Sequence, residues 1–330
     1  MDRLAEIFGK ENVLKDEPMS RHTTFRIGGA ADFFVKVQTI SQLQEAVRYL
    51  KKEQIPFYIV GNGSNLLVRD EGVRGVVLQL GERFSGYEFL HETPGSVAQK
   101  DTAAVSGAGQ TAQIPAGTAV DKNQIVMVRA KAGSLLGRLG KEFAEYSLSG
   151  FEFASGIPGT LGGAVYMNAG AYGGEIKDIL VRATLMDMDG NLLEFTNQQM
   201  QFGYRKSIAA EKNYIVLEAD LALHVSSKEE VLAKMAELSA QRRLKQPLEY
   251  PSAGSTFKRP EGYFAGKLIS DAGLKGFSVG GAQVSEKHAG FVINTGNATA
   301  ADVIALTDAV RDKVFEKYGV KLELEIKQLG

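Results

Sequence analysis

The chain has 330 residues, a length typical of about two domains. Hydrophobic residues make up 44% of it and charged residues 23%, so it has the composition of an ordinary globular protein with enough apolar side chains for a sizeable core. The net charge of -1 excludes a basic field for nucleic acid, and the absence of cysteine excludes disulfides, thiolate nucleophiles and cysteine-ligated metals.

The distribution of apolar residues and of histidines indicates where the protein is located and whether it binds a metal. The chain contains no apolar run of about 18 residues, and its first residues mix acidic with basic side chains. We therefore expect a cytoplasmic protein without a membrane segment. The four histidines are scattered without the spacing of metal ligands, so we expect no metal site.

The first part of the chain predicts a βαβ unit. Strands at residues 31–37 and 56–60, rich in β-branched and aromatic side chains, flank a predicted helix at 42–53. A capping box of Ser41 and Gln44 marks the start of this helix.

A glycine-containing loop, GNGSN, follows the second of these strands at residues 61–65. Its glycines and small polar side chains form a tight backbone concavity whose N–H groups suit a diphosphate. Leu66 stands where a dinucleotide-binding fingerprint has its third glycine, and no Gly-Lys-Ser/Thr follows as in a P-loop. Taken alone, the loop also fits a plain turn.

A glycine-dense stretch lies at residues 150–175, where eight glycines are mixed with small residues. Each glycine weakens a helix or strand, so such a run indicates backbone that takes positive φ or approaches a ligand closely. Pro158 suits the first turn of a short helix at 159–167, whose free N–H groups would point at an anion. Together with the GNGSN loop, the stretch predicts a dinucleotide clamp. The alternative is a hinge between two domains, which needs far fewer glycines.

The chain changes character between residues 91 and 123, where core-forming side chains are few and a long part carries no charge. We expect a mobile surface insertion there. Regular structure is predicted to resume with a strand at 125–131 and a helix capped by Ser134. Further on, Asp189-Gly190 predicts the tight turn of a hairpin.

The last third reads as helices and short strands. Ser227 with Glu230 is a second capping box, which opens a long helix. The final strand alternates apolar with charged residues, so that Glu325 is expected on its solvated face, opposite Leu324 and Ile326.

Six motifs, in their order along the chain, carry a resemblance to one family: HTTFRIGG, GNGSNLLV, GIPGTLGGAVYMNAGAYGGE, FGYRKS, PSAGSTFKRP and LELEI. On these motifs the chain resembles the UDP-N-acetylenolpyruvoylglucosamine reductases, also called UDP-N-acetylmuramate dehydrogenases, in the subtype that lacks a long tyrosine-bearing substrate loop. The resemblance covers nearly the whole chain apart from residues 91–123.

The resemblance implies an α+β fold. Its FAD-binding domain is of the vanillyl-alcohol-oxidase/p-cresol-methylhydroxylase type and has two lobes, and a C-terminal α+β domain binds the substrate. In this chain the implied boundaries give FAD-binding lobe 1 at residues 1–80, lobe 2 at 81–225 with the insertion at 91–123, and the substrate domain at 226–330.

The implied activity is the reduction of UDP-N-acetylglucosamine enolpyruvate to UDP-N-acetylmuramate in peptidoglycan synthesis. Hydride passes from NADPH to flavin N5 and then to the enolpyruvyl group. By the same resemblance, FAD would be held without a covalent bond by residues of the two glycine-containing segments: Gly61, Asn62, Gly63, Ser64, Asn65, Leu66, Gly156, Ile157, Pro158, Gly159, Thr160, Gly163, Ala164, Asn168, Gly170 and Ala171. We expect a monomer that binds neither nucleic acid nor membrane.

Three residues match the family's catalytic positions. Arg205 in GYRKS and Glu325 in the final strand would stabilise the enolate that forms beside the substrate carboxylate. Ser255 in AGST would deliver a proton to the other carbon of the double bond. Without the resemblance, the three also fit a surface cation, a turn serine and a solvated carboxylate. Four further candidates for the UDP-sugar or its diphosphate are Tyr204, Arg243, Arg259 and Lys275.

Two positions depart from the family pattern. Leu324 stands where many relatives have proline, and Arg259 stands where they have asparagine, so the diphosphate contacts stay open. Two other functions also fit the sequence. One is an FAD-linked oxidase of the same flavin superfamily that acts on another alcohol or sugar. The other is a flavin- or nucleotide-binding sensor of cell-wall precursors, which need not keep the three catalytic candidates.

Overall fold

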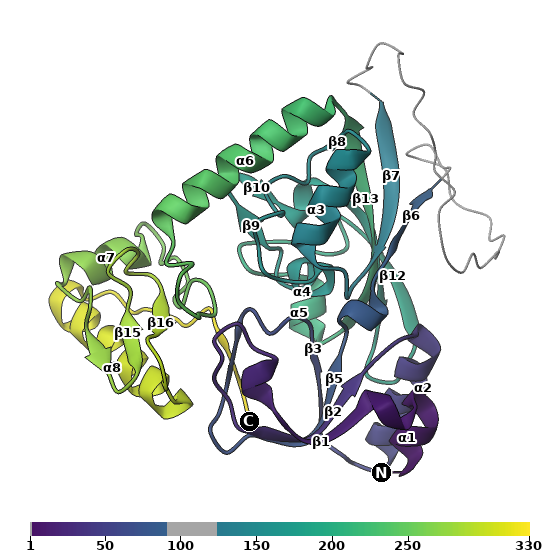
Figure 1. Ribbon diagram of the computed structural model, residues 1–330, viewed down its shortest axis with the longest axis horizontal. Helices are drawn as coiled ribbons and strands as arrows, with labels where there is room; N and C mark the ends of the chain where they lie inside the picture. The colour runs from purple at the N-terminus through teal and green to yellow at the C-terminus, as the bar shows by residue number, and fades with distance from the viewer. Residues whose placement is uncertain (1, 91–123) are drawn as a thin grey trace. The chain divides into compact units, whose positions relative to one another are not determined.

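The computed structural model describes residues 2–90 and 124–330, so the insertion expected at 91–123 lies outside the described part of the chain. The contacts between residues divide the chain into two units, Met1–Arg83 with Ser239–Gly330 and Phe84–Leu238 (Figure 1). The two lobes and the substrate domain expected from the sequence, with boundaries at 80 and 225, stay a prediction.

In the first unit, the N-terminal residues form a four-stranded sheet in the order β1-β2-β5-β3. Its strands are β1 (Val13–Pro18), β2 (Ala30–Lys36), β3 (Phe57–Val60) and β5 (Val73–Gln79). β2, β5 and β3 run parallel, and helix α2 (Ile40–Lys52) connects β2 to β3, which confirms the predicted βαβ unit. Helix α1 (Asp2–Phe8) packs on α2, whose apolar stripe is buried: Leu43, Ala46, Val47 and Leu50.

The predicted capping box of α2 is wrong by two residues. Thr39, not Ser41, caps the helix, because its hydroxyl accepts from the Gln42 amide while the Gln42 side chain accepts from the Thr39 amide. The Val37 amide still donates to Gln79 in the sheet. The chain therefore turns into the helix as soon as it leaves the sheet, and it uses the first of two possible capping boxes.

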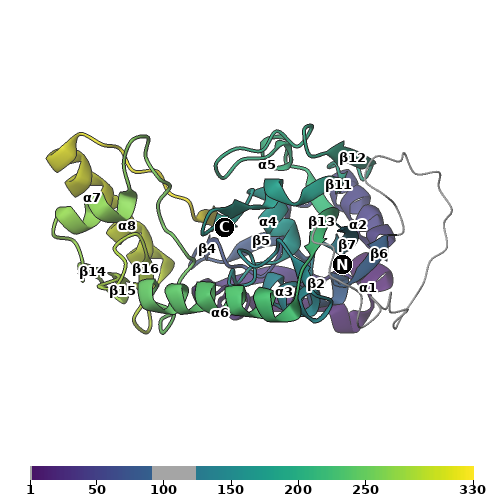
Figure 2. The same cartoon turned by 90° about the horizontal axis from the view of Figure 1, so that it is seen from above.

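The residues after Ser239 contribute a small α+β layer to the first unit. A three-stranded antiparallel sheet packs against helix α8 (Ala300–Tyr318), and α7 (Ala265–Asp271) lies beside α8 (Figure 2). The strands are β14 (Ser278–Val279), β15 (Ala282–Val284) and β16 (Val292–Asn294). Thr299 caps α8 in a capping box with Asp302.

Two short strands join the end of the chain to the N-terminal part of the same unit. β17 (Lys327–Leu329) runs parallel to β4 (Leu66–Val68), which directly follows the GNGSN loop. The prediction of a regular final strand at 321–327 is therefore wrong in its bounds. Ahead of β17, Leu324 forms an isolated bridge with Phe257, so the backbone changes its pairing partner within a few residues and no single ladder runs through it.

The second unit is built on a sheet in the order β12-β11-β13-β7-β6, with β8 paired to the end of β13 (Figure 1). β11 and β12 form the hairpin that Asp189-Gly190 predicted. The strands are β6 (Tyr87–Leu90), β7 (Ile125–Lys131), β8 (Leu148–Ser149), β9 (Gly170–Ala171), β10 (Gly174–Glu175), β11 (Leu180–Met186), β12 (Leu192–Thr196) and β13 (Ile215–Val225), and the helices are α3 (Leu136–Glu145), α4 (Leu161–Tyr166), α5 (Ile208–Lys212) and α6 (Lys228–Lys245), which runs into the first unit.

The two serines predicted to cap helices in this unit differ in outcome. Ser134 does not cap α3, which begins at Leu136 without a side-chain cap. Its hydroxyl instead donates to the Gly86 carbonyl at 3.1 Å and accepts from the Gly86 amide at 3.0 Å, which ties the turn after β7 to the residues before β6. Ser227 does cap α6, because its hydroxyl accepts from the Glu230 amide at 3.1 Å.

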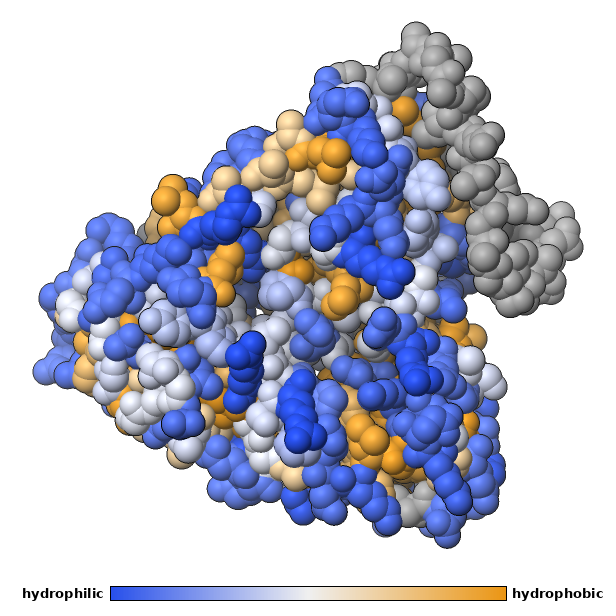
Figure 3. All heavy atoms as spheres, viewed as in Figure 1, coloured by the Kyte–Doolittle hydropathy of each residue, from blue (hydrophilic) through white to orange (hydrophobic). Residues whose placement is uncertain are grey.

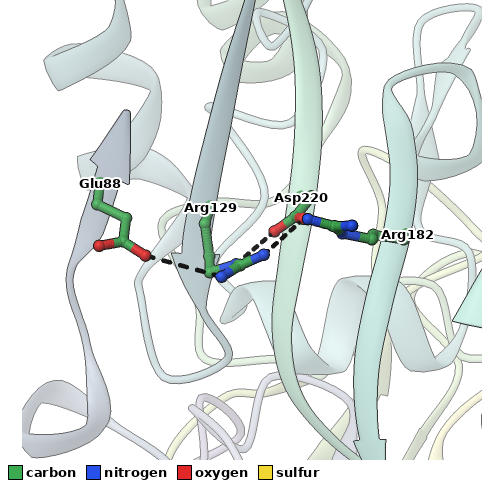
Figure 4. A network of polar contacts seen from close by, with 4 residues as sticks. All are labelled: Glu88, Arg129, Arg182 and Asp220. Atoms are coloured by element: carbon green, nitrogen blue, oxygen red, sulfur yellow. Dashed lines mark hydrogen bonds and ion pairs between the residues drawn. The ribbon is translucent and has the colours of Figure 1, made fainter. Parts of the chain in front are cut away.

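A charge network links four neighbouring strands of this sheet (Figure 4). Arg129 on β7 and Arg182 on β11 both donate to the carboxylate of Asp220, which lies between them on β13. Glu88 on β6 adds a longer ion pair, 3.9 Å from its Oε1 to Arg129 Nη1. Asp220 is buried, so the two guanidinium groups provide the hydrogen bonds that its charge requires.

Hydrophilic side chains predominate on the face shown in Figure 3, and hydrophobic ones are scattered among them. Among residues 2–90 and 124–330, no helix combines the length and the apolar character needed to span a membrane. Within the same residues, histidine, aspartate and glutamate side chains form no cluster of three or more that could hold a metal ion.

Candidate active site

The GNGSN loop after β3 is fixed by residues of the HTTFRIGG motif. Gly63 has a φ of 62°, and a Cβ atom there would lie 2.0 Å from the carbonyl oxygen of His22, so only glycine fits. The Thr24 amide donates to the Gly63 carbonyl at 3.3 Å, and the Thr24 hydroxyl donates to the Ser252 carbonyl at 2.7 Å. The ring of His22 stacks on Phe34 of β2, with centroids 3.8 Å apart. The motif therefore holds both the loop and the segment that leads to Ser255.

Asn65, in the same loop, joins it to the last residues of the chain. Its side-chain amide donates to the Glu325 carbonyl at 3.2 Å, and its own carbonyl accepts from the Lys327 amide at 2.9 Å. The loop expected to bind FAD is thus hydrogen-bonded to the segment that carries a catalytic candidate.

Ser255 lies in a loop whose next residue is held on two sides. The Thr256 amide donates to the Gly290 carbonyl at 2.9 Å, and the Thr256 hydroxyl accepts from the Val292 amide of β16 at 2.9 Å. Thr256 is buried, whereas Ser255 is half-buried. The serine side chain therefore sits on a fixed backbone and is still accessible to a small molecule.

Glu325 lies against this serine loop. Its amide donates to the Thr256 carbonyl at 2.8 Å. Leu324, which precedes Glu325, and Phe257, which follows Thr256, form the isolated bridge described above. Only 7% of Glu325 is exposed, so the expectation of a solvated face is wrong. The irregular backbone before β17 breaks the alternation, and Glu325 is buried together with its neighbour Ile326. Carboxylates are seldom buried unless they are paired or functional, which marks Glu325 as a candidate for chemistry.

The glycine-dense stretch in the second unit forms a shorter helix than predicted. α4 begins at Leu161, and Pro158 lies before it rather than in its first turn. The amides of Leu161 and Gly162 donate to the carbonyls of Ser134 and Ala132 at 2.9 and 2.8 Å. The prediction that the first free amides of this helix point at an anion is therefore wrong for these two, because the turn after β7 already uses them.

Two adjacent glycines of α4 have different surroundings. A Cβ atom on Gly162 would lie 2.7 Å from the Cβ of Ala132, so the protein itself requires this glycine. A Cβ atom on Gly163 would meet only Thr160 Oγ1, at 3.9 Å, within the described residues. Glycine costs about 1 kcal/mol relative to alanine inside a helix. Because the protein leaves room at Gly163, the missing side chain fits the close approach of a bound group such as FAD.

Arg205 occupies the tight turn of the FGYRKS motif. The Gly203 amide donates to the Lys206 carbonyl at 3.1 Å and the Lys206 amide donates back to Gly203 at 3.2 Å, with Tyr204 and Arg205 between them. Arg205 has a φ of 52°, a left-handed conformation that costs about 1–2 kcal/mol for a residue with a Cβ atom. Strain of this kind persists where the surroundings enforce it, commonly at functional sites. The guanidinium carbon lies 5.2 Å from the centroid of the Tyr204 ring.

Asn168 connects the glycine-dense stretch to this turn. Its side chain is fully buried and donates to the Gly203 carbonyl at 3.1 Å and to Glu175 Oε2 at 3.0 Å. Its side-chain oxygen accepts from the Lys177 amide at 3.0 Å. Both amide hydrogens are therefore used inside the protein, so the predicted contact of Asn168 with FAD would have to come from its backbone.

The four substrate-binding candidates lie at the surface. Arg243 donates to Ser239 one turn earlier on α6, at 2.7 Å. The guanidinium carbon of Arg259 lies 4.1 Å from the centroid of the exposed Phe264 ring. Lys275 is on the turn before β14, and Tyr204 is on the Arg205 turn. Their exposure leaves them accessible to a polar ligand, and their substrate contacts stay a prediction.

The structure thus brings together three of the segments singled out in the sequence, all within the first unit: the GNGSN loop, the Ser255 loop and the residues around Glu325. Arg205 belongs to the second unit, where it is joined to the glycine-dense stretch. The sequence missed Glu175, which ends the hairpin of β9 and β10, and Lys177, which lies in the turn just after it. No helical or strand periodicity relates them to Asn168, and only the fold makes them neighbours.

Two parts of the chain match known domain families. Residues 246–329 match the family described as UDP-N-acetylenolpyruvoylglucosamine reductase, C-terminal domain. Residues 31–122 and 118–196 match the FAD binding domain. The chain therefore carries an FAD-binding domain followed by a C-terminal domain typical of these reductases.

Named relatives cover nearly the whole chain. A UDP-N-acetylenolpyruvoylglucosamine reductase of Clostridioides difficile is 47% identical over 99% of this chain and 96% of its own length. The one from Agathobacter rectalis is 51% identical over 96% of this chain and 94% of its own. A crystal structure of the reductase from Thermus caldophilus has a TM-score of 0.73 and 34% identity, over 96% of this chain and 98% of that one.

These matches confirm the expected α+β class, with an FAD-binding domain of the vanillyl-alcohol-oxidase/p-cresol-methylhydroxylase type ahead of the C-terminal domain. The chain belongs to the UDP-N-acetylenolpyruvoylglucosamine reductase family and is an oxidoreductase.

Proposed function

We propose that this protein uses NADPH to reduce the enolpyruvyl ether of UDP-N-acetylglucosamine to the lactyl ether of UDP-N-acetylmuramate, a step of peptidoglycan synthesis. The names of its relatives, over nearly their whole length, support the substrate class. The observation that carries the proposal is the pairing of Glu325 with Thr256, which places a buried carboxylate beside the Ser255 loop. We also propose that the reaction takes place in the cytoplasm.

FAD, when bound, supplies the hydride that the enolpyruvyl group accepts. The glycine segments would hold it, and the space at Gly163 together with the fixed backbone of Gly63 supports this. Recognition there depends on main-chain groups and small side chains, since neither segment carries a positively charged side chain. This composition fits a non-covalently held dinucleotide whose diphosphate is bound by backbone N–H groups.

Three side chains would act on the substrate. Reduction of the double bond at its terminal carbon leaves negative charge spread into the neighbouring carboxylate. Arg205 would stabilise that charge with its permanently charged, planar donor group, and Glu325 in its protonated form would donate a hydrogen bond to it. Ser255 would give its hydroxyl proton to the other carbon, where the carbanionic character makes even a weak acid sufficient.

Stopped-flow flavin spectroscopy tests this assignment. The enzyme is reduced anaerobically with NADPH and mixed with UDP-N-acetylglucosamine enolpyruvate, and flavin reoxidation is followed. We expect rapid reoxidation of the wild type and a rate lower by about 10²–10⁴-fold for Ser255→Ala, with flavin reduction by NADPH unchanged. Ser252→Ala, three residues earlier and also half-buried, is the matched control and should react like the wild type.

Two outcomes would contradict the proposal. If the reduced wild-type flavin ignores the enolpyruvyl substrate and is reoxidised only by oxygen, the oxidase alternative takes its place. If the purified protein is colourless and still binds the UDP-sugar, the sensor alternative does.

A further inference from the structure

The turn that presents Arg205 is attached to the glycine-dense stretch at both ends. At its start, the Gly203 carbonyl accepts from Asn168 at 3.1 Å. At its end, the buried hydroxyl of Ser207 donates to the Tyr166 carbonyl at 2.5 Å and accepts from the Ala210 amide as the cap of α5. A strained backbone at Arg205 can persist only because such contacts hold the residues on either side of it.

Asn168 is suited to this role by its backbone as well as its side chain. Its φ of 46° is in the left-handed region, which asparagine tolerates better than most residues with a Cβ atom. The side chain then makes three hydrogen bonds in a fully buried position. A buried amide with its hydrogen bonds made specifies one geometry, because each unmade bond would leave a buried polar group without a partner.

Glu175 brings a negative charge to the same place. Its carboxylate binds Lys177 Nζ at 2.8 Å and accepts from Asn168 at 3.0 Å. The hydrogen bond from Lys177, followed by that from Asn168 and by the attraction of Arg205, lowers the pKa of Glu175 below its ordinary value. Glu175 is therefore ionised at neutral pH, and its hydrogen bond with Asn168 helps to hold the side chain that anchors the Arg205 turn.

We propose that Asn168 and Glu175 are positioning residues for Arg205: Asn168 fixes the turn through the Gly203 carbonyl, and Glu175 holds the Asn168 side chain in place by accepting its other hydrogen bond. The inference rests on the proposed function, in which Arg205 stabilises the negative charge that develops on the substrate. The inference gives Asn168 and Glu175 a role beyond that of the three catalytic candidates. A misplacement of the Arg205 guanidinium by about 1 Å can cost on the order of 10²-fold in rate, so residues that fix its position are needed.

Hydrogen–deuterium exchange of the segment 202–207 tests the first half without any assay of activity. Asn168→Gly removes the side chain and keeps a residue that accepts the left-handed backbone. We expect the amides of Gly203 and Lys206 to exchange at least about tenfold faster, because the turn loses its anchor. Asn213→Gly is the matched control, since Asn213 also has a left-handed φ, of 56°, in the same unit but an exposed side chain. Unchanged exchange in Asn168→Gly would overturn the anchoring role.

A double-mutant cycle on substrate-dependent flavin reoxidation tests whether both residues act through Arg205. With the wild-type arginine, Asn168→Gly and Glu175→Gln should each slow reoxidation by about 10–100-fold. In an Arg205→Ala background neither should slow it further. Equal factors in both backgrounds would show independent effects and overturn the proposal.

The two measurements separate this inference from the function on which it rests. If the enolpyruvyl substrate does not reoxidise even the wild-type flavin, the proposed function fails. The hydrogen–deuterium exchange rates of residues 202–207 still decide whether Asn168 anchors the turn. If the wild type is reoxidised by the substrate, and Asn168→Gly and Glu175→Gln are reoxidised as fast as the wild type, the proposed function stands and the positioning role is contradicted.

Discussion

The main-chain amide of Glu325 donates to the carbonyl of Thr256 at 2.8 Å, so the residue that directly follows Ser255 is hydrogen-bonded to a buried carboxylate near the end of the chain. Two candidates for substrate chemistry, separated by most of the C-terminal domain, are thereby held on adjoining backbone. The bridge between Leu324 and Phe257 extends the same pairing by one step.

Substitution of Glu325 should separate hydrogen-bond donation from charge. Glu325→Ala removes a donor to the developing enolate, and we expect flavin reoxidation by the substrate to slow by about 10²–10³-fold. Glu325→Gln keeps a donor of the same size and should cost less than about tenfold. Glu323→Ala, on the same segment but with a mostly exposed side chain paired to Lys258, is the control and should react like the wild type. Equal losses in Glu325→Ala and Glu325→Gln would show that donation is not the role of this residue.

The first turn of α8 should depend on Asp70. Its two carboxylate oxygens accept from the amides of Ala300 and Ala301 at 2.8 and 2.9 Å, which satisfies donors that a helix start leaves open. We expect Asp70→Ala to lower the free energy of unfolding by about 0.5–2 kcal/mol in urea titrations. Asp312→Ala, at an exposed position of the same helix, should change it by less than about 0.5 kcal/mol. Similar values for the two variants would contradict the capping role.

Removal of Asp220 should destabilise the sheet of the second unit, because Arg129 and Arg182 would then face each other without the carboxylate (Figure 4). The hydrogen bond that Arg129 donates to Asp220 is also the main cause of the raised pKa of Arg129. We expect Asp220→Ala to lower the free energy of unfolding by about 2–3 kcal/mol. Breaking a fully buried ion pair typically costs about 3–5 kcal/mol. We expect a smaller loss here because the side chains of Arg129 and Arg182 are 29% and 28% exposed.

Urea denaturation measures this loss. Glu145→Ala is the control, because the side chains of Glu145 and Lys228 are 63% and 41% exposed and such surface pairs contribute about 0–1 kcal/mol. A loss for Asp220→Ala no larger than that of the control would mean that the network adds nothing to stability.

His288 should make the stability of the protein depend on pH. Burial lowers the pKa of this imidazole below its ordinary value near 6.5, and the positive charge of Lys275 lowers it further, although the imidazole's contact with its own backbone opposes both. The unfolded chain therefore binds more protons than the folded one just below pH 6.5, so the free energy of unfolding falls as the pH drops through this window and levels off below the folded pKa.

Proton NMR of the imidazole, assigned with His288→Gln, measures this pKa directly. Urea denaturation at a series of pH values should show a shallower decline for His288→Gln than for the wild type. A titration midpoint of His288 at or above 6.5 would contradict the prediction.

Local patterns in the sequence predicted most of the fold, because adjacent residues decide them. The stripe of α2, the hairpin at Asp189-Gly190 and the cap of α6 at Ser227 each depend on side chains within one or two turns of chain. The errors lie where two local solutions compete. Thr39 and Ser41 both offer a capping box, and only the exit of the chain from the sheet at Val37 selects the first.

The candidate site was less predictable, because distant contacts decide it. Glu325 was expected to face solvent from the alternation of its segment, yet the change of pairing partner around Leu324 buries it. Part of the glycine-dense stretch meets the protein and not a ligand, since Gly162 packs on Ala132, a residue outside the motif. The partners of Asn168 were missed for the same reason, because nothing in the spacing of Asn168, Glu175 and Gly203 relates them.

The parallel pairing of β17 with β4 has a consequence for biosynthesis. The GNGSN loop is made early on the ribosome, but the hydrogen-bond partners of Asn65 lie about 260 positions later, and Leu66–Val68 gains its neighbouring strand only from Lys327–Leu329. Domains of a nascent chain generally fold in order of synthesis. Here the GNGSN loop is completed only by residues 325–329, so the loop, and with it the FAD binding proposed there, is expected to become stable only once those residues have been made.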